Sequence, residues 1–292
     1  MKETGIKVIA ITGATATGKT KYSIELAQKL NGEIISADSR MIYKYYDIAT
    51  AKPTIKERNG VVHHLIDIIE PEQDFSVAEF VVMAKSLCRE ITSRGKIPII
   101  VGGTGLYFKV LAEDYNIPAV PANKELRKEL EDFAKENDVQ KLHEMLQDLD
   151  YETAQKVHPN NVVRVIRCIE IIKTLNATIG DLQRKYVDDE FDIDFIGLNY
   201  NDRNKLYARI NQRVDEMLEN GLFEEAKTLF EKYGKTNSYQ NTIGYQEFIP
   251  FFEDQTDMET AIELIKQHTR NYAKRQISLL KTIKKINWQE IK

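Results

Sequence analysis

Cysteine is scarce in this sequence: Cys88 and Cys168 are the two among 292 residues, and they lie in unrelated segments. This excludes a disulfide framework or a cysteine-rich metal site, and we expect two buried, reduced thiols. Long apolar runs are also missing, since no stretch approaches the roughly 20 residues that cross a bilayer. Met1–Thr4 leads into a strand-like run without an apolar signal region, so we expect a cytoplasmic protein with no membrane partner.

An excess of basic charge is missing as well, because 41 Lys and Arg stand against 45 Asp and Glu and give a net charge of −4. The chain as a whole therefore does not attract nucleic acid, and any such partner has to meet a local basic face. Internal repeats and low-complexity segments are absent too. With 42% hydrophobic residues, the chain can form one large domain or two ordinary ones.

The N-terminal third alternates between short apolar runs and amphipathic stretches. Its expected strands are Val8–Thr12, Glu33–Ala37, Val61–Ile69 and Ile97–Val101, and its expected helices are Lys19–Leu30 and Val77–Arg94. Strands that are almost continuously apolar and alternate with helices indicate a parallel sheet covered on both faces. The fold class is therefore α/β.

The pattern changes after the first third of the chain. A charged helical stretch runs from Asn123 to about Lys185, entered through Pro118–Pro121 and left through Asp188–Glu190. A strand follows at Phe195–Asn199, and then long helices at Arg203–Asn220 and Met258–Lys285. We predict a discontinuous catalytic core, residues 1–112 and 195–292, with basic C-terminal helices, and an inserted helical domain, residues 113–194.

A glycine-rich loop between the first strand and the first helix fits the pattern G-x-x-x-x-G-K-[ST] completely. Its residues are Gly13, Ala14, Thr15, Ala16, Thr17, Gly18, Lys19 and Thr20. Such a loop turns backbone N–H groups and a helix N-terminus toward phosphate oxygens, which predicts a P-loop NTPase-like core. Lys19 supplies a positive charge, and the Thr20 hydroxyl is a ligand for Mg²⁺. The loop alone favours ATP and a kinase or NTPase.

Polar residues follow two other strands. Asp38 and Ser39 come after the second strand, and Thr104 lies among the glycines after the fourth. In a doubly wound sheet these strand ends share one edge with the glycine loop. Asp38 is thus a Mg²⁺ ligand, a general base or a simple cap, and Thr104 either binds substrate or forms a turn. The neighbouring His63 and His64 point to opposite faces of a strand and are expected to be structural.

Basic residues gather in three places. Lys205, Arg209 and Arg213 form a stripe at helical spacing, and Arg164 lies three residues before Arg167 in the helical insertion. The segment 266–292 holds eight Lys and Arg against one acid, with Tyr272 and Trp288 among them. Three interpretations stay open for these basic groups, namely a solvated helix face, a clamp for phosphate oxygens and a surface that contacts RNA.

Together these segments resemble the tRNA dimethylallyltransferase (isopentenyltransferase) family along nearly the whole chain. Besides the glycine loop, the matching blocks are Ile35–Tyr43, Asp47–Pro53, His63–Asp67, Val101–Tyr107, His158–Asn161 with Arg164 and Arg167, Tyr207–Ile210 with Arg213, Thr242–Glu247 and Tyr272–Gln276.

The resemblance implies a definite reaction. The loop would hold the diphosphate of dimethylallyl diphosphate, with Mg²⁺ at Thr20 and Asp38. The acceptor would be the N6 amine of the adenosine 3′ of the anticodon in tRNA. It also implies that Asp38 is the general base, that Lys19 and Arg213 stabilise the departing diphosphate, and that Thr104 touches the flipped-out adenosine.

The resemblance further implies that the insertion grips the anticodon stem-loop, and we expect a monomer. The implied tRNA-binding residues are Asp38, Ser39, Arg40, Met41, Thr104, Arg127, Val163, Arg164, Val165, Ile166, Arg167, Thr242, Gly244, Tyr245, Gln246, Lys274 and Arg275.

Several positions depart from the family pattern. Met41 replaces a frequent Gln, Thr242 and Gln246 replace a frequent Ala and Lys, and Ile277–Leu280 lacks the common Thr-Trp-Phe-Arg. These changes leave open an altered tRNA preference. Two other activities also stay open, namely prenylation of a free adenine nucleotide and an ATP-dependent kinase reaction. A free nucleotide needs neither a helical insertion nor a basic C-terminal segment, and the kinase reading rests on the glycine loop alone.

Overall fold

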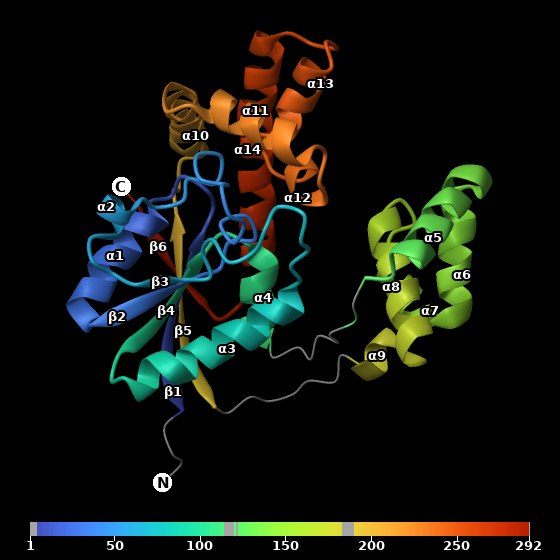
Figure 1. Ribbon diagram of the computed structural model, residues 1–292. Helices are drawn as coiled ribbons and strands as arrows, with labels where there is room; N and C mark the ends of the chain where they lie inside the picture. Colours follow the sequence, from blue (N-terminus) through green and yellow to red (C-terminus); the bar gives the residue numbers. More distant parts are fainter. Residues whose placement is uncertain (1–4, 114–119, 121, 183–189, 292) are drawn as a thin grey trace. The chain divides into compact units, whose positions relative to one another are not determined.

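The computed structural model describes residues 5–113, 120, 122–182 and 190–291 (Figure 1). The chain divides into two compact units, one formed by residues 1–112 and 189–292 and the other by residues 113–188. The expected entry through Pro118 and Pro121 and exit through Asp188 and Asp189 lie outside the described residues.

The first unit is built on a sheet whose described strands are β1 (Ile6–Gly13), β2 (Gly32–Ser36), β3 (His63–His64), β4 (Ile97–Gly102), β5 (Phe191–Asn199) and β6 (Ile286–Glu290). Their order is β3-β2-β4-β1-β5-β6, and every neighbouring pair is parallel. The chain places β4 on one side of β1 and β5 on the other. The glycine loop after β1 therefore leaves the sheet at the point where ligands bind in open α/β sheets, and the predicted α/β class is confirmed.

Two predicted strands have different bounds in the structure. The strand expected at Val61–Ile69 is reduced to His63–His64, because Leu65 and Asp67 have φ angles of 59° and 58° that turn the chain out of the sheet. The strand expected at Phe195 already begins at Phe191, and its first residues pair with β1 from Ile6 onward. Asp192 and Asp194 in this part of the strand are exposed. Together with the acidic residues before them, they make the sequence look like a polar loop, so the beginning of the strand was not predicted.

The C-terminal segment also differs from the prediction. Helix α14 (Met258–Leu280) ends before Lys285, and the chain then forms edge strand β6. Trp288 lies in this strand opposite Gly197 and packs against the hydrophobic core of the sheet. Tyr272 and Trp288 therefore do not belong to one RNA-contacting helix face.

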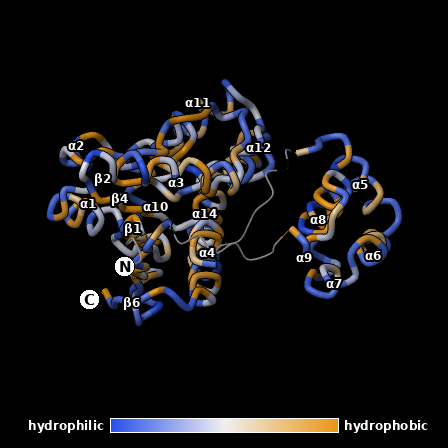
Figure 2. Tube along the Cα trace, turned by 90° about the horizontal axis from the view of Figure 1, so that it is seen from below, coloured by the Kyte–Doolittle hydropathy of each residue, from blue (hydrophilic) through white to orange (hydrophobic). Residues whose placement is uncertain are grey.

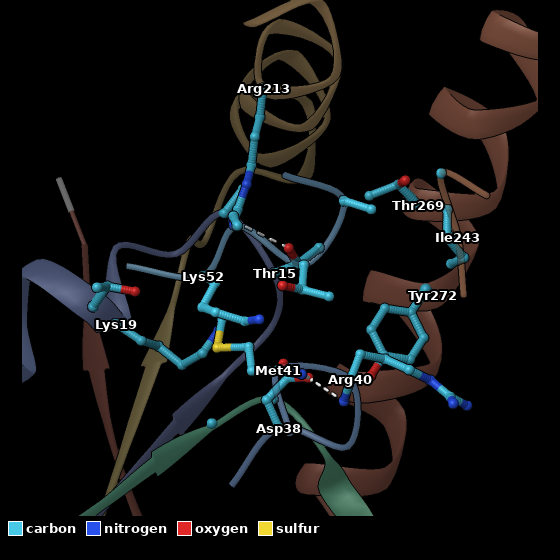
Figure 3. Close-up of a pocket in the computed structure, with 18 of the residues that line it drawn as sticks. Thr15, Lys19, Asp38, Arg40, Met41, Lys52, Arg213, Ile243, Thr269 and Tyr272 are labelled. Carbon is cyan, nitrogen blue, oxygen red and sulfur yellow. Dashed lines mark hydrogen bonds between the residues drawn. The ribbon is translucent and has the colours of Figure 1, made fainter. Parts of the chain in front are cut away.

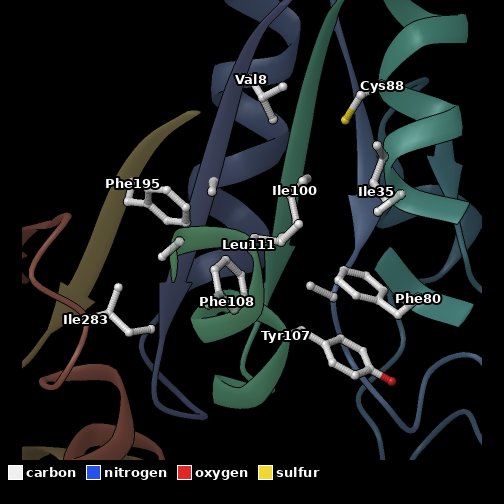
Figure 4. Close-up of a cluster of buried hydrophobic side chains, with 14 of the residues drawn as sticks. Val8, Ile35, Phe80, Cys88, Ile100, Tyr107, Phe108, Leu111, Phe195 and Ile283 are labelled. Atoms are coloured by element: carbon white, nitrogen blue, oxygen red, sulfur yellow. The ribbon is translucent and has the colours of Figure 1, made fainter. Parts of the chain in front are cut away.

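Helices cover both faces of the sheet. Helix α1 (Lys19–Leu30) packs Ile24 and Ala27 against one face, and helices α3 (Val77–Ser93) and α4 (Gly105–Glu113) cover the other. Phe80 of α3 and Tyr107 of α4 stack with ring centroids 4.0 Å apart, and the Cys88 thiol is buried in the same cluster (Figure 4).

Except for the short helix α2 (Ile55–Arg58), which buries none of its residues, the remaining described helices of the first unit enclose a second, aromatic core. They are α10 (Arg203–Glu219), α11 (Leu222–Tyr233), α12 (Asn237–Gln240), the 3₁₀ helix η1 (Gln246–Phe248), α13 (Ile249–Phe252) and α14. Tyr46, Tyr239, Tyr245 and Phe248 are fully buried among them. This core fastens the segment after β2 to the C-terminal helices.

The second unit consists, in its described part, of helices α5 (Lys124–Asn137), α6 (Val139–Leu149), α7 (Tyr151–Ala154), α8 (Val162–Leu175) and α9 (Ile179–Leu182). Helix α8 is its most hydrophobic element and α5 its most hydrophilic (Figure 2). Leu142, Leu146, Val165 and Ile169 form the centre of its own core. Among the described helices of either unit, none is long and apolar enough to span a membrane.

Candidate active site

A pocket of about 790 Å³ opens beyond the carboxyl ends of the central strands of the first unit. The glycine loop, the end of β2, helix α10 and helix α14 contribute its walls, and Lys19, Asp38, Arg213 and Tyr272 line it (Figure 3). The pocket thus brings together the glycine loop, Asp38 with Ser39, and the glycines Gly102 and Gly103 after β4, whereas the predicted Thr104 is not among its lining residues.

The glycine loop has the backbone that phosphate binding requires. Gly18 precedes α1 with φ 77° and ψ 16°, a left-handed conformation that leaves the helix N-terminus without a side-chain cap. Ala16 also has a positive φ, of 63°. The Thr17 hydroxyl and the Lys19 ammonium both donate to the Ala14 carbonyl, at 2.8 and 2.7 Å. Lys19 therefore lies folded over the loop, where a bound anion would replace the carbonyl as its partner.

Helix α10 supplies two arginines to the loop. The Arg213 guanidinium donates to the Thr15 hydroxyl at 3.3 Å, and Arg209 donates to the Ala16 carbonyl at 3.3 Å. Lys205, the third residue of the predicted stripe, is exposed and lies outside the pocket lining. The stripe therefore serves the pocket through Arg209 and Arg213.

The charges in the pocket are poorly compensated. Burial and the Arg213 charge together lower the pKa of Lys19 to about 7, while Asp38 opposes this shift. Burial also lowers the pKa of Arg213. Among the described residues, neither side chain forms an ion pair with a carboxylate. Two cations without a paired acid in a confined space favour the binding of an anion.

Asp38 lies across the pocket from these cations. Its Oδ1 accepts hydrogen bonds from the backbone N–H groups of Arg40 at 2.8 Å and Met41 at 3.3 Å (Figure 3). No described group is recorded as donating to its Oδ2. The carboxylate is thus oriented by the backbone, which leaves one oxygen for a proton or a metal ion.

The two predicted Mg²⁺ ligands have side chains of the kind that this ion prefers. Thr20 and Asp38 both line the pocket and present hard oxygen atoms, which Mg²⁺ prefers. The described residues hold no group of three or more His, Cys, Asp or Glu that could bind a metal ion alone. A Mg²⁺ ion here would therefore depend on substrate oxygens and water for most of its ligands.

Thr104 has a structural role in this geometry. Its hydroxyl accepts a hydrogen bond from Ser39 N–H at 3.0 Å, and its own N–H donates to the Ala37 carbonyl at 3.3 Å. The hydroxyl proton remains available to a ligand. Thr104 therefore joins the ends of β2 and β4. His64 bonds the Glu33 carboxylate and His63 bonds the Val61 carbonyl, and His63 also lines the pocket.

Sequence spacing does not reveal the residues that hold the segment after β2 in place. Lys52 is buried, lines the pocket and bonds the carboxylates of Asp47 and Asp67 at 2.6 and 2.5 Å. Glu225 of α11 accepts from the backbone N–H groups of three successive residues, 47–49. Both are ordinary charged residues by spacing, and only the fold reveals their partners.

Most of the C-terminal residues with an implied tRNA contact are part of this scaffold. Tyr245 is fully buried and donates its hydroxyl proton to Glu225 at 2.6 Å, and the Thr242 hydroxyl donates to the Ser238 carbonyl. Gly244 and Gln246 both donate to Glu247, although they line the pocket. The Tyr245 side chain is therefore out of reach of an RNA ligand, because it lies inside the aromatic core.

Helix α14 presents two exposed cations, with Arg275 at the pocket and Lys274 over the Tyr207 ring. Ser39, Arg40 and Met41 line the pocket opposite. The divergent stretch Ile277–Leu280 ends inside the protein, since Leu280 is fully buried in the core of the sheet, whereas Ser278 is exposed.

The second unit divides its predicted tRNA-binding residues into two groups. Val163 is 81% exposed and Arg164 is exposed, whereas Val165 and Ile166 are 0% and 4% exposed in the helical core. The side chains of Val165 and Ile166 therefore cannot reach RNA, because a helix that buries one face exposes only the other.

Arg127 and Arg167 meet on one buried acid. Both bond the carboxylate of Glu170, whose side chain is 0% exposed, and Asn123 N–H donates to it at 2.6 Å. Neighbouring positive charges and hydrogen bonds outweigh burial and lower the pKa of Glu170. The two arginines thus fasten α5 to α8 and keep only part of their hydrogen-bonding capacity for a ligand.

Comparisons with known proteins find isopentenyl- and dimethylallyltransferases along nearly the whole chain. The profile of a family described as IPP transferase matches residues 41–282, and that of a family described as isopentenyl transferase matches residues 6–67. The chain is 45% identical over 288 residues to a tRNA dimethylallyltransferase of Anoxybacillus flavithermus, covering 97% of this chain and 90% of that protein. It is 43% identical to one from Thermoanaerobacter sp., with 97% and 91% covered.

Solved structures give the same picture. A tRNA isopentenylpyrophosphate transferase of Bacillus halodurans has a TM-score of 0.71 at 42% identity, covering 98% of this chain and 90% of that one. A eukaryotic dimethylallyltransferase described as acting on tRNA has a TM-score of 0.74 at 31% identity, covering 97% and 73%.

Proposed function

This chain belongs to the IPP transferase family, and we propose that it transfers the dimethylallyl group of dimethylallyl diphosphate to tRNA, with release of diphosphate. The acceptor is the N6 amine of the adenosine 3′-adjacent to the anticodon. The observation that carries this proposal is the pocket in which Lys19 and Arg213, without a paired acid, lie across from the oriented carboxylate of Asp38.

The reaction needs stabilisation of the leaving diphosphate and activation of the adenine amine as a nucleophile. The N6 nitrogen attacks C1 of the dimethylallyl group, the C1–O bond breaks, and its electron pair leaves with the diphosphate. Lys19, Arg213 and the amides of the glycine loop stabilise the charge that develops on the departing oxygen. The Asp38 carboxylate takes a proton from the amine as the C–N bond forms, because an adenine amine is a poor nucleophile.

Mg²⁺ is the metal that suits this site. Thr20 and Asp38 would hold it through oxygen atoms or water, and the ion would neutralise part of the diphosphate charge.

Recognition of tRNA uses cations on both units. On the first unit these are Arg40, Lys274 and Arg275, and on the second Arg164 together with the partly exposed Arg127 and Arg167. The adenosine leaves the RNA stack to enter the pocket, where the Thr104 hydroxyl donates to it. The exposed arginines bind backbone phosphates.

A labelling experiment tests the proposal. The protein is incubated with Mg²⁺, dimethylallyl diphosphate carrying a radiolabelled prenyl group, and unmodified tRNA that reads codons beginning with U. We expect label in the RNA and, after digestion, in N6-prenylated adenosine. Label in free AMP at a comparable kcat/KM would point to the nucleotide-prenylating alternative. Phosphate transfer from ATP without prenyl transfer would point to the kinase.

A further inference from the structure

Gln276 connects the glycine loop to the C-terminal helix. Its side chain is 5% exposed, and its Oε1 accepts a hydrogen bond from Thr15 N–H at 2.9 Å. Its Nε2 donates to the Gly103 carbonyl at 2.7 Å. One amide of α14 thus bonds the loop after β1 and the loop after β4 at once, across sequence separations of 261 and 173 residues.

The fit around this side chain is tight. A Cβ atom added at Gly103 would lie 2.3 Å from the Gln276 Nε2, so the amide would have to move away from its present position. Loss of the Gln276 amide would remove a hydrogen-bond partner from both the part-buried Thr15 N–H and the buried Gly103 carbonyl.

Thr15 is therefore fixed from two sides. The Gln276 side chain of helix α14 accepts a hydrogen bond from the Thr15 N–H, and Arg213 of helix α10 donates one to the Thr15 hydroxyl. The N–H of Thr15 points to α14 and is not available to a phosphate oxygen. Thr15 is the third residue of the glycine loop, so these two bonds hold the start of the loop in place.

From this geometry we propose that Gln276 is a positioning residue for the diphosphate. By fixing Thr15 it holds the glycine loop in the conformation that receives the diphosphate, while Lys274 and Arg275 beside it stay on the exposed side of the helix. This inference rests on the proposed function for the identity of the substrate, but it predicts diphosphate binding independently of prenyl transfer.

The first test replaces Gln276 by Met, which has a similar length and makes no hydrogen bonds. We expect KM for dimethylallyl diphosphate to rise about tenfold, since the loop loses the hydrogen bond that fixes Thr15. KM for tRNA should stay within about twofold, and calorimetry with inorganic diphosphate and Mg²⁺ should show the same loss of affinity. Ser278→Ala, on the exposed side of the same helix, is the control and should change neither value.

The second test uses Gln276→Glu. A protonated carboxyl has the donor and acceptor of the amide, whereas a carboxylate repels the Gly103 carbonyl. Diphosphate affinity relative to wild type should therefore recover as the pH falls from about 8.5 to about 5.5, because burial raises the pKa of a carboxyl. Taking the ratio to wild type removes the titration of the other ionisable groups that line the pocket, which are Lys19, Lys21, Asp38, Arg40, Lys52, Glu57, His63, Arg209, Arg213, Glu216, Tyr272 and Arg275.

Circular dichroism melting separates positioning from folding. The proposal is wrong if Gln276→Met binds diphosphate as wild type does, if the Glu variant shows no recovery at low pH, or if both variants lose the folded state. Should the wild type fail to prenylate tRNA while its diphosphate affinity still depends on Gln276, the proposed function fails and the positioning role stands.

Discussion

The two units of this chain use arginine in opposite ways. In the helical unit, Arg127 and Arg167 converge on the buried carboxylate of Glu170, which joins α5 to α8. In the sheet unit, Arg213 and Lys19 converge on the glycine loop, where they bond a hydroxyl and a carbonyl and pair with no described carboxylate. In the first arrangement the cations are paired with a buried carboxylate, and in the second they have no paired carboxylate among the described residues.

This difference separates structural from functional charge. A buried acid with two cations needs no ligand, because its hydrogen bonds are already satisfied. Two confined cations that bond only neutral oxygens gain strongly from a polyanion such as diphosphate. The sequence pattern alone does not distinguish the cases, since Arg164, Arg167 and Arg213 are all arginines on amphipathic helices.

The largest expected effect comes from Asp38, the carboxylate that faces the cations of the pocket without pairing with them. Asp38→Asn preserves the acceptor for the Arg40 and Met41 amides but removes the base. We expect kcat for tRNA prenylation to fall by about 10²–10⁴, with tRNA affinity and melting temperature nearly unchanged. Single-turnover kinetics provide the measurement, and a kcat within about threefold of wild type would exclude a general-base role.

Lys19→Met should have the next largest effect. Removing one charge that stabilises the leaving group is expected to lower kcat/KM by about 10²–10³. The protein should melt no lower than wild type, because the variant also removes a desolvated charge. The matched control is Lys29→Met, an exposed lysine of the same helix outside the pocket. Equal losses in both variants would contradict a specific role for Lys19.

Glu170→Gln tests the structural role of the paired arginines in the helical unit. Replacing this buried carboxylate weakens its charge-assisted bonds to Arg127 and Arg167, so we expect a loss of about 1–3 kcal/mol in the stability of the helical unit. Urea unfolding followed by far-UV circular dichroism measures it. Binding of inorganic diphosphate should stay unchanged, and weaker diphosphate binding would show that the separation of the two roles is wrong.

The pH dependence of diphosphate binding sharpens the same comparison. With a pKa of about 7, Lys19 is charged below that pH and becomes neutral above it. Above pH 7 a bound diphosphate must restore the charge, so binding takes up a proton and affinity falls by up to about tenfold per pH unit. Calorimetry in buffers of different ionisation enthalpy measures this uptake. In Lys19→Met the proton uptake that comes from Lys19 should be absent. Identical proton uptake in the wild type and in this variant would contradict the assignment of the proton to Lys19.

The smallest effect is expected for Arg164, whose exposed side chain contrasts with the paired Arg167 on the same helix. Arg164→Ala should weaken tRNA binding about threefold and lower the salt slope of log K by about 1. The measurement is filter binding at several salt concentrations. Lys173→Ala, at the other end of α8, serves as the control. An unchanged slope for Arg164→Ala would remove this residue from the RNA interface.

Local spacing was enough to predict the glycine loop and the edge of the sheet at which it lies. The parallel sheet, helix α1 and the placement of Asp38 and Thr104 beside the loop follow from apolar runs and strand ends. The resemblance to the family added the chemistry, because the loop by itself favours ATP.

The missed features depend on partners far away in the chain. Gln276 and Glu225 look like ordinary polar residues of helices, and their bonds join segments 261 and about 177 residues apart. Strand β6 was hidden because Ile286–Glu290 carries few apolar residues and packs as an edge strand. The burial of Val165, Ile166 and Tyr245 likewise follows from which helix face meets a neighbour.

The most direct test of the account concerns which bond breaks at the glycine loop. Dimethylallyl diphosphate labelled with ¹⁸O in the oxygen between C1 and the α-phosphorus is incubated with the protein, Mg²⁺ and unmodified tRNA, and the products are analysed by mass spectrometry. If the loop holds a leaving group, all ¹⁸O appears in the released diphosphate and the prenylated adenosine carries none. Cleavage on the phosphorus side, with ¹⁸O in dimethylallyl alcohol or a phosphorylated product, would contradict it.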